Sequence, residues 1–486
     1  MKNLKQLIII GLGVLCPSLT IAQDIIDNAI TFSNTSTWGT ARSRGLGGVG
    51  YSFGGDISSA HINPAGLGFY NRSDFSITPV VDFIDTESMY LGNQSGTNLS
   101  RFNIGNIGVA INSGPLSSDW HSGTFGFSID RINNFSRDIS YSGSNPEDSF
   151  VEYVYFANAN GEEGYLIDLA FDTFILENIT NDNGQQVDTT FIAPPSPEFP
   201  VQQTEFIERR GGQYRYSISY GANYRDKLYV GASIGAYSID YEQLRTYSEV
   251  HADTELDQLL LSEYLQISGS GIDFSAGLIF RPTESVTFGL RGKTPTWYSL
   301  EENFETTLIA DFFLPVQESY DQTYLFNPFE YNLRSPAEVG GGITYFFGNY
   351  GFLSADVNYK NFASINISGN GPDAFSFENE TIDIIAQDVI DIRAGGEVRL
   401  NPFRIRAGYA RYGDPLSGVD DLDRSRSEIS GGVGFRGESF YIDLALTQST
   451  FNTAITPYPL PESLSSNFAT LDNKRFTGSI TAGFTF

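Results

Sequence analysis

Cysteine is nearly absent from this sequence. Among 486 residues there is a single cysteine, Cys16, close to the start of the chain. Disulfide bridges and thiol chemistry beyond that position are therefore excluded. A chain of this length must instead be stabilised by extensive hydrogen bonding and burial. Cys16 is also a poor lipidation site, because the preceding Val14 and Leu15 are larger than the small residues usual at that place.

Basic residues are also scarce. The chain has 29 lysines and arginines against 58 aspartates and glutamates, which gives a formal net charge of −29. Nucleic acids and other polyanions are excluded as partners, because binding them requires a basic surface. We interpret most acidic residues as solvated loop residues rather than as ligands of a cation.

Long apolar runs are absent after the first two dozen residues. The early run at residues 7–15 is about nine residues long, too short to span a bilayer as a helix. It follows Lys2 and Lys5 and precedes small residues that end at Ala22, which is the pattern of a secretory signal peptide. We predict that residues 1–22 are removed. If the remaining chain spans a membrane, it must do so as a closed barrel.

Alternation with a period of two dominates the rest of the chain and predicts β-strands. Within residues 390–400, apolar residues alternate with a face that includes Asp391, Arg393 and Glu397. So charged a face must meet water or a polar interior, as in transmembrane barrels. A soluble sandwich shows the same alternation, so this pattern alone leaves both folds open. At the C-terminus one face consists of Phe476, Gly478, Ile480, Ala482, Phe484 and Phe486.

The lengths of the connections favour the barrel. The alternating segments are residues 74–90, 100–114, 123–141, 206–224, 227–242, 264–281, 286–302, 328–347, 351–366, 388–400, 403–412, 425–436, 440–453 and 473–486. Short turns alternate with long connections, which we place at 142–205, 243–263, 303–327, 367–387, 413–424 and 454–472. Short periplasmic turns opposite long external loops are typical of an up-and-down outer-membrane barrel. We therefore predict an all-β fold, a transmembrane antiparallel β-barrel of about fourteen strands at residues 73–486, in the outer membrane of a Gram-negative bacterium.

The last strand ends in an aromatic residue. Outer-membrane strands commonly end in this way, so Phe484 and Phe486 are predicted to form the signal that the barrel-assembly machinery reads. We expect a monomer that contacts outer-membrane lipid.

Residues 23–72 do not alternate and are rich in glycine. A barrel of about fourteen strands is too wide for its wall side chains to fill, so this segment is predicted to be a hatch inside the lumen. Asn63 and Pro64 fix a turn, because proline locks φ and restricts the residue before it. Ala65 follows, and Gly66 is expected to take a positive φ and redirect the chain into the wall.

The segment "GTARSRGLGGVGYSFGGDISSAHINPAGLG" (residues 39–68) resembles the N-terminal hatch of the FadL-type outer-membrane transporters of long-chain fatty acids and other hydrophobic compounds. Its "GTAR…GLGG" version is similar to the Bacteroidetes-like branch. The resemblance implies that a hydrophobic ligand is caught at the outer loops, passes to a pocket above the hatch and leaves partly through a gap in the wall. The gap cannot be placed from the sequence, although residues 130–138 interrupt the alternation.

An external loop contains the apolar stretch "YLIDLAFDTFIL" at residues 165–176. Such a stretch either packs against other loops, which we favour, or binds an apolar ligand. Its candidate ligand-capture residues are Leu166, Leu169, Phe171 and Phe174. The stretch "LDQLLLSEYL" at residues 256–265 is expected to be a second apolar loop segment.

Other motifs carry little weight. Residues 45–50 match a dinucleotide-binding pattern but lack the strand and helix that it requires. His61, His121 and His251 fall in different predicted regions, so no Ser-His pair is supported. The acidic stretches 181–184 and 419–423 do not complete a calcium loop.

We expect a channel for hydrophobic small molecules that is not an enzyme and needs no cofactor or metal. Two other functions stay open on sequence alone. The first is a scaffold or shuttle that binds secreted proteins, as in type IX secretion. The second is a barrel phospholipase.

Overall fold

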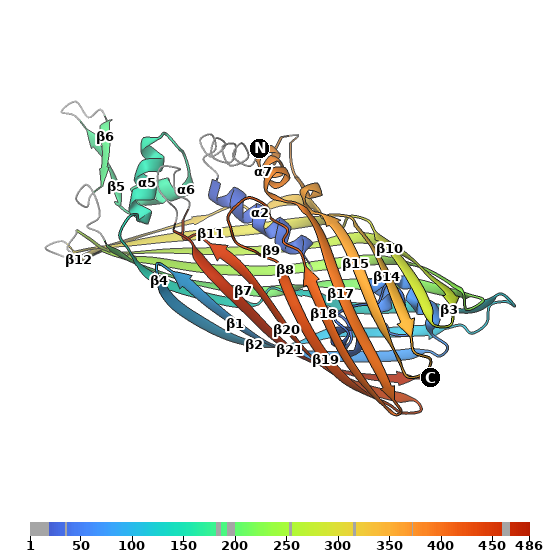
Figure 1. The fold of residues 1–486 in the computed structure, drawn as a ribbon. Coiled ribbons are helices and arrows are strands. Elements are labelled where there is room, and N and C mark those ends of the chain that lie inside the picture. The colour runs from blue at the N-terminus through green and yellow to red at the C-terminus, as the bar shows by residue number, and fades with distance from the viewer. Residues whose placement is uncertain are drawn as a thin grey trace.

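The computed structural model describes residues 19–34, 36–180, 186–191, 200–251, 255–313, 317–371, 373–458 and 467–486. These residues form a closed antiparallel β-barrel, elongated along its strands (Figure 1). Strand β1 (Asp74–Tyr90) pairs with β21 (Ala469–Thr485) and so joins the first strand of the wall to the last. The predicted fold class is confirmed.

Nineteen strands of one sheet form the fourteen segments of the wall, because four segments are interrupted. In chain order the segments are β1, β2 (Asn93–Asn112), β3 (Trp120–Asn134) with β4 (Arg137–Asn145), β7 (Val201–Tyr224), β8 (Leu228–Val250), β9 (Leu256–Thr283), β10 (Val286–Lys293) with β11 (Trp297–Phe313), β12 (Gln317–Leu325) with β13 (Phe329–Arg334) and β14 (Glu338–Phe346), β15 (Gly351–Asn361) with β16 (Asn366–Ser368), β17 (Asp388–Leu400), β18 (Phe403–Tyr412), β19 (Arg426–Arg436), β20 (Phe440–Ile455) and β21.

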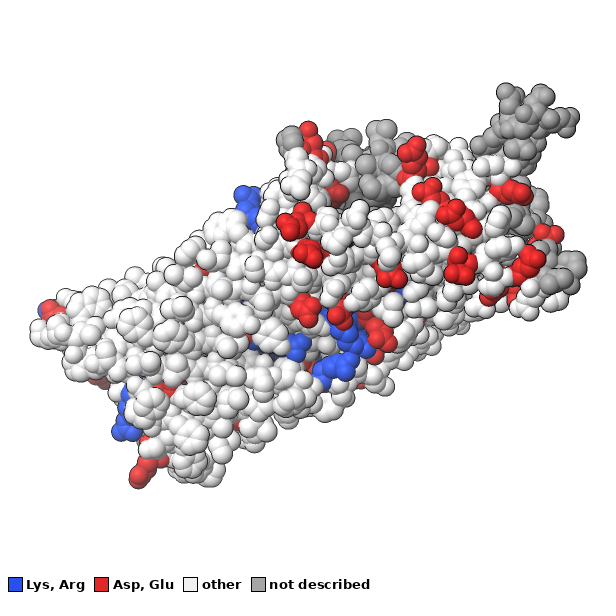
Figure 2. All heavy atoms as spheres, turned by 180° about the vertical axis from the view of Figure 1, so that it is seen from behind, with Lys and Arg blue, Asp and Glu red and all other residues white. Residues whose placement is uncertain are grey.

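The two faces of the wall differ as the alternation predicts. In β17, Ile390 and Ile392 are exposed on the outside, whereas Asp391 between them is buried on the inside. On the face seen in Figure 2, a large part of the barrel is almost uncharged, acidic side chains gather toward one end, and a group of Lys and Arg lies between these two parts. An apolar outside and a polar inside suit a wall that faces lipid. Among the described residues, no helix is long and apolar enough to cross a membrane.

The residues before β1 lie inside the barrel (Figure 1). They form α2 (Leu19–Ser33), α3 (Ala41–Gly45), α4 (Ser59–Ile62) and the 3₁₀ helix η1 (Pro64–Phe69). Helix α3 contacts β18 to β21, whereas η1 contacts β3, β7, β8 and β9. The segment therefore touches opposite parts of the wall. The predicted signal peptide lies largely outside the described residues, and α2 continues through its predicted end at Ala22.

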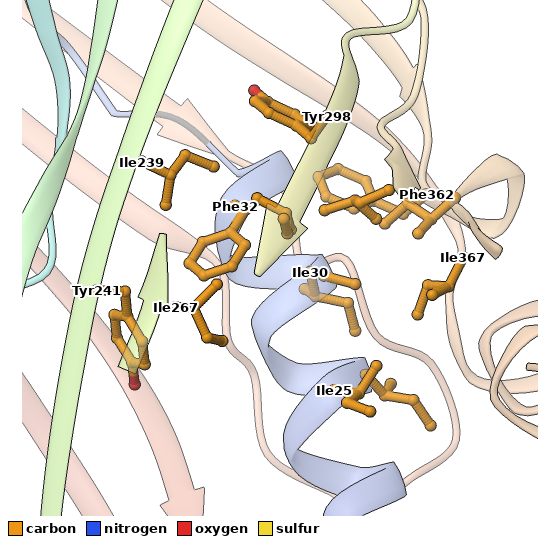
Figure 3. Close-up of a cluster of buried hydrophobic side chains, with 14 of the residues drawn as sticks. Ile25, Ile30, Phe32, Ile239, Tyr241, Ile267, Tyr298, Phe362 and Ile367 are labelled. Carbon is orange, nitrogen blue, oxygen red and sulfur yellow. The ribbon is translucent and has the colours of Figure 1, made fainter. Parts of the chain in front are cut away.

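Helix α2 packs on the inner wall toward the acidic end. Figure 3 shows Ile25, Ile30 and Phe32 of α2 among side chains of β8, β9, β11 and β16. These residues belong to one buried cluster. Apolar packing therefore holds the N-terminal helix in place, since burial of such side chains is favourable.

The acidic end also carries most of the remaining elements. They are α5 (Phe150–Ala159), α6 (Tyr165–Asp172), β5 (Leu176–Thr180), β6 (Gln186–Phe191), η2 (Phe362–Ser364) and α7 (Ser376–Ile385). Short turns occupy the opposite end, as predicted.

Two of the predicted long loops are wrong. Residues 243–263 and 303–327 continue the strands, so that β8 reaches Val250 and β11 reaches Phe313. The apolar stretch at residues 256–265 is thus part of β9 rather than a loop. The leucines on its inner face are buried in a cluster with α5 and α6. This packing explains why the stretch is strongly apolar although it belongs to an alternating strand.

Candidate functional site

The predicted turn at Asn63 is fully buried and hydrogen-bonded. Its side-chain Oδ1 accepts from Ala65 N at 3.1 Å, and its Nδ2 donates to Tyr51 O at 2.6 Å and to Leu290 O at 3.3 Å. Pro64 begins η1, where proline lacks only a donor that the helix start leaves unused. The side chain of Asn63 thus connects the turn, the hatch segment at Tyr51 and the wall.

Gly66 differs from the expectation. It lies within η1 and is not among the residues with positive φ. A Cβ at this position would lie 2.7 Å from Ser59 Oγ and 3.1 Å from Phe53 O. Close packing, rather than a left-handed backbone, is therefore what requires glycine here.

Glycines of the wall let the hatch backbone approach closely. A Cβ on Gly408 would lie 2.2 Å from Gly47 N, and one on Gly277 would lie 1.7 Å from Asn63 Oδ1. Such distances exclude any side chain. Other wall glycines in the same situation are Gly231, Gly289 and Gly395. The hatch and the wall therefore fit each other backbone to backbone around the lumen.

Buried charged side chains form a second set of contacts between the hatch and the wall. Arg42 of the hatch lies 3.5 Å from Glu397 of β17, which also pairs with Arg406 at 2.8 Å. Asp356 of β15 accepts from the backbone N–H groups of Gly50 and Tyr51 at 2.7 and 3.0 Å. Removing Glu397 would leave the buried Arg42 without its ion-pair partner, which is costly.

The wall is interrupted in its third segment. Strand β2 pairs with β1 along its length, but it pairs with β3 only from Asn106 to Asn112. Strand β4 pairs with β7 alone. Residues 93–105 therefore have no ladder partner on that side among the described strands. We call this boundary between β2 and β4 the seam.

Strand β4 passes on the inner side of the wall at the seam. Ser88, which faces the lumen from β1, donates a hydrogen bond to the carbonyl of Ser140. Thr97 of β2 likewise donates to the carbonyl of Asp138. A few side-chain hydrogen bonds thus replace a backbone ladder.

The interruption falls at Phe135 and Ser136, within the stretch 130–138 where the alternation fails. Phe135 turns inward, and its ring lies 5.4 Å from the rings of Phe32 and Tyr241. Arg131 donates to Gly211 O at 2.8 Å and holds the bend. Burial of Phe135 against α2 explains why the strand leaves the wall.

A cavity lies directly behind the seam. Its lining includes Asn103 of β2, Asn134 of β3, Arg426 of β19, Phe451 of β20 and Arg475 of β21. These arginines were not identified from the sequence as site residues. The only signal was their charge on the polar face of predicted strands, which many lumen residues share.

The loop residues proposed for ligand capture divide into two pairs. Leu166 and Leu169 of α6 are buried in a cluster with leucines of β9 and β11. Phe171 is partly buried, and Phe174 is exposed beside Tyr320 with a centroid distance of 4.6 Å. Of the four, Phe174 is the most accessible to a ligand.

The terminal residues complete the barrel. Phe486 N donates to Ser73 O at 3.0 Å and Ser73 N donates to Phe486 O at 3.1 Å. The rings of Phe484 and Phe486 are exposed on the outside. Their role as an assembly signal stays a prediction.

The three histidines lie far apart in the fold. His61 is buried in the hatch against Trp38, His121 contacts Asp226 in a short turn, and His251 lies 3.3 Å from Glu249 at the outer end of β8. Within the described parts of the chain, no group of histidine, cysteine and acidic residues is arranged to hold a metal. In the stretch 419–423, Asp420 is paired with Arg424. The stretch 181–184 lies outside the described residues.

The closed wall, the apolar belt and the segment packed in the lumen define an outer-membrane β-barrel with an occupied interior. No protein-family model matches the sequence, and no curated protein matches it. The fold is nevertheless that of the FadL-type transporters. A FadL homologue from Pseudomonas aeruginosa gives a TM-score of 0.56 at 13% identity, covering 93% of this chain and 98% of that one.

Two toluene transporters have the same fold. TbuX of Ralstonia pickettii gives a TM-score of 0.52 at 16% identity, and TodX of P. putida gives 0.51 at 14%. Each match covers 93% of this chain and 99% of the other. At such identities the likeness describes the fold, and the ligand of this chain has to be argued from its own residues.

Proposed function

We propose that this protein is a channel for passive uptake of hydrophobic small molecules, such as long-chain fatty acids or hydrocarbons. The observation that carries the proposal is the pairing of a filled lumen with an interrupted wall. The hatch contacts the wall closely on several sides, and we propose that this fit denies a solute a straight path along the axis. The seam offers a route through the side, directly into the lipid where an apolar solute is most soluble.

Neighbouring apolar residues would lead a ligand from the outer end of the barrel to the seam. Phe174 and neighbouring apolar residues at the outer end would meet the ligand first. Helix α2 and Phe135 lie between that end and the seam, and they share one buried cluster. A displacement of α2 would free Phe135 and so loosen β4. We expect the hatch turn at Asn63 to stay fixed during this step, because its contacts are to the wall on several sides.

Uptake by cells tests the proposal. We would express the protein in the outer membrane of a strain that lacks transporters for hydrophobic compounds and measure initial uptake rates of labelled decanoate, toluene and sucrose. We expect faster uptake of at least one apolar solute and no change for sucrose. Rates equal to those of the empty vector for both apolar solutes would contradict a channel.

The solved neighbours support a channel over an enzyme, since two of them are described as toluene transporters and one as a FadL homologue. No specific contact favours the scaffold or phospholipase alternatives. Co-purification of a secreted protein in detergent, without any effect on uptake, would favour the scaffold.

A further inference from the structure

Strand β12 is an edge strand at the outer end of the barrel (Figure 1). It pairs with β11 along its whole length, and among the described strands it has no partner on its other side. Strand β13 follows it in the chain but lies beside the other half of β11, where it pairs with β16. The backbone of nine residues in β12 is therefore available to another strand.

Strand β12 lies beyond the part of the wall that faces lipid. The outward side chains of β11 begin with the exposed ring of Trp297 and continue with Ser299, Glu301 and Glu305. Lipid-facing side chains are apolar, and aromatic rings are enriched at the membrane boundary, so the lipid ends near Trp297. Strand β12 begins to pair with β11 only at Glu305, which is opposite Leu325. Its free edge is therefore in water.

The usual protections of an edge strand are missing here. An unpaired edge invites another strand to add to it, and lysine, proline and β-bulges are common ways to prevent this. The sequence of β12 is QESYDQTYL, and its ladder with β11 has no register shift. Its only charged residues are Glu318 and Asp321, and both are exposed. The edge is thus open to a strand of suitable charge.

The two carboxylates decide which charge is suitable. Asp321 is the central residue of β12, so antiparallel pairing with a second copy about this residue would place two Asp321 side chains opposite each other, which is unfavourable. The acidic side chains gathered toward this end add to the repulsion between copies (Figure 2). A strand that carries lysine or arginine is attracted instead.

Apolar side chains lie on both faces of the same hairpin. On the outward face, Leu325 is 76% exposed and Phe313 is 72% exposed. On the opposite face, the ring of Tyr320 lies 4.6 Å from the ring of Phe174. Successive side chains of an added strand would point to these two faces in turn, so apolar contacts are available on both sides of its backbone.

We propose that the free edge of β12 binds an extended, lysine- or arginine-bearing segment of another protein, which adds to the sheet as a further strand outside the membrane. In this mode, main-chain hydrogen bonds provide affinity and alternate side chains provide specificity. Water satisfies the edge when it is empty, so the barrel does not need the partner to fold. Docking is a function in addition to uptake, because β12 belongs to neither the hatch nor the seam.

Peptide binding to the full-length protein in phosphatidylcholine nanodiscs tests the edge. The probe is a fluorescent peptide of the same length as β12 in which threonine and lysine alternate. Two matched peptides separate its features. One has glutamate in place of lysine, and the other keeps lysine but has N-methylated backbone amides, which cannot donate hydrogen bonds to a strand. Empty nanodiscs measure binding to lipid.

The double variant E318K/D321K reverses the charge of the edge. Its matched control is D421K/E380K, which changes the net charge equally at two exposed residues outside β12. We expect the unchanged protein and the control to bind the lysine peptide at least about tenfold more tightly than either matched peptide. The E318K/D321K variant should lose its preference for lysine over glutamate. Heat-modifiable mobility on gels reports whether each variant is folded.

Two results of this experiment would overturn the proposal. Equal binding of the lysine peptide and its N-methylated form would show that charge attracts the peptide without strand addition. An equal loss of preference in D421K/E380K would show that the whole acidic end attracts the peptide, rather than the edge of β12.

Disulfide trapping locates the added strand. Thr323→Cys in β12 should form a disulfide with a lysine peptide that has a central cysteine, whereas Ser262→Cys in β9 should not, because β11 lies between β9 and β12. Equal yields at the two positions would contradict docking at the edge. A disulfide-linked dimer of the Thr323→Cys protein in cell membranes, formed without peptide, would assign the edge to a second copy and overturn the proposal. Neither result depends on whether the protein transports a solute.

Discussion

The hatch and the seam are two contacts between inner segments and the same wall, and they are built in opposite ways. At the hatch, wall glycines such as Gly408 and Gly289 let backbone meet backbone, and buried ion pairs add to the fit. At the seam, β4 lies beside β2 without a ladder and is held by side-chain hydrogen bonds from Ser88 and Thr97. We expect the seam to be the contact that opens, because opening it costs a few hydrogen bonds, whereas moving the hatch disrupts its packing against the surrounding wall.

The largest effect is expected where the tight contact is broken by one methyl group. Gly408→Ala places a Cβ about 2 Å from the hatch backbone, and such overpacking costs about 3 kcal/mol or more. We expect residues 39–69 to exchange amide hydrogens much faster and hydrophilic antibiotics to leak into cells.

Gly478→Ala is the matched control, because its Cβ would meet only Leu446 Cδ2, at 3.8 Å. This variant should behave like the unchanged protein. If Gly408→Ala also leaves exchange and leakage unchanged, the close fit is not what holds the hatch.

A smaller effect is expected from Asn63→Ala. The substitution leaves the buried carbonyls of Tyr51 and Leu290 without their amide donor, at a cost of about 2 kcal/mol. Hydrogen exchange should rise around residues 51 and 65 while β1 stays protected. Asn93→Ala, in an exposed hairpin, serves as the control. Equal exchange in both variants would show that the turn does not depend on the asparagine side chain.

The smallest effect concerns helix α5, which follows β4 in the chain and packs with α6 in one buried cluster. Burial and the nearby charges of Asp148 and Glu249 raise the pKa of Glu152 in α5 to about 7 from 4.5. Between these pH values Glu152 keeps its proton when α5 is folded and releases it when α5 is unfolded. The free energy of unfolding of α5 therefore falls as the pH rises through this window. We expect α5 to exchange a few-fold faster at pH 8 than at pH 5, after correction for the intrinsic rate.

Glu152→Gln should flatten this pH dependence. The substitution does not abolish the pH dependence, because burial also raises the pKa of Asp148. A variant with the same slope as the unchanged protein would assign the effect to other groups.

Much of the wall could be predicted from the sequence. Alternation with a period of two shows where a strand lies and which of its side chains face the lumen. Strand ends were less predictable. At the outer end of β9 the same alternation continues, but the leucines face α5 and α6 instead of the lumen. Their apolar content therefore favours a loop segment when only the sequence is considered. The turn at Asn63 was located by its proline, but the reason for Gly66 was not, since close contact to Ser59 depends on the tertiary fold.

The seam and its arginines could not be predicted for a related reason. The stretch 130–138 shows that alternation fails, but not that Phe135 packs on α2, a helix about a hundred residues earlier in the chain. Arg131, Arg426 and Arg475, which line the cavity behind the seam, are likewise far apart in sequence. Only the closure of β1 against β21 brings them to one cavity.

A reversible cross-link at the seam tests the central claim most directly. The single native cysteine lies in the predicted signal peptide, so Thr97→Cys with Ser140→Cys can be bridged by a short thiol reagent and later released. Thr86→Cys with Thr97→Cys is the control, because these residues already face each other in the ladder of β1 and β2. We predict that bridging 97 to 140 stops uptake of decanoate and toluene and that release restores it, whereas bridging 86 to 97 has no effect. Unchanged uptake across a fully bridged seam would contradict a lateral route.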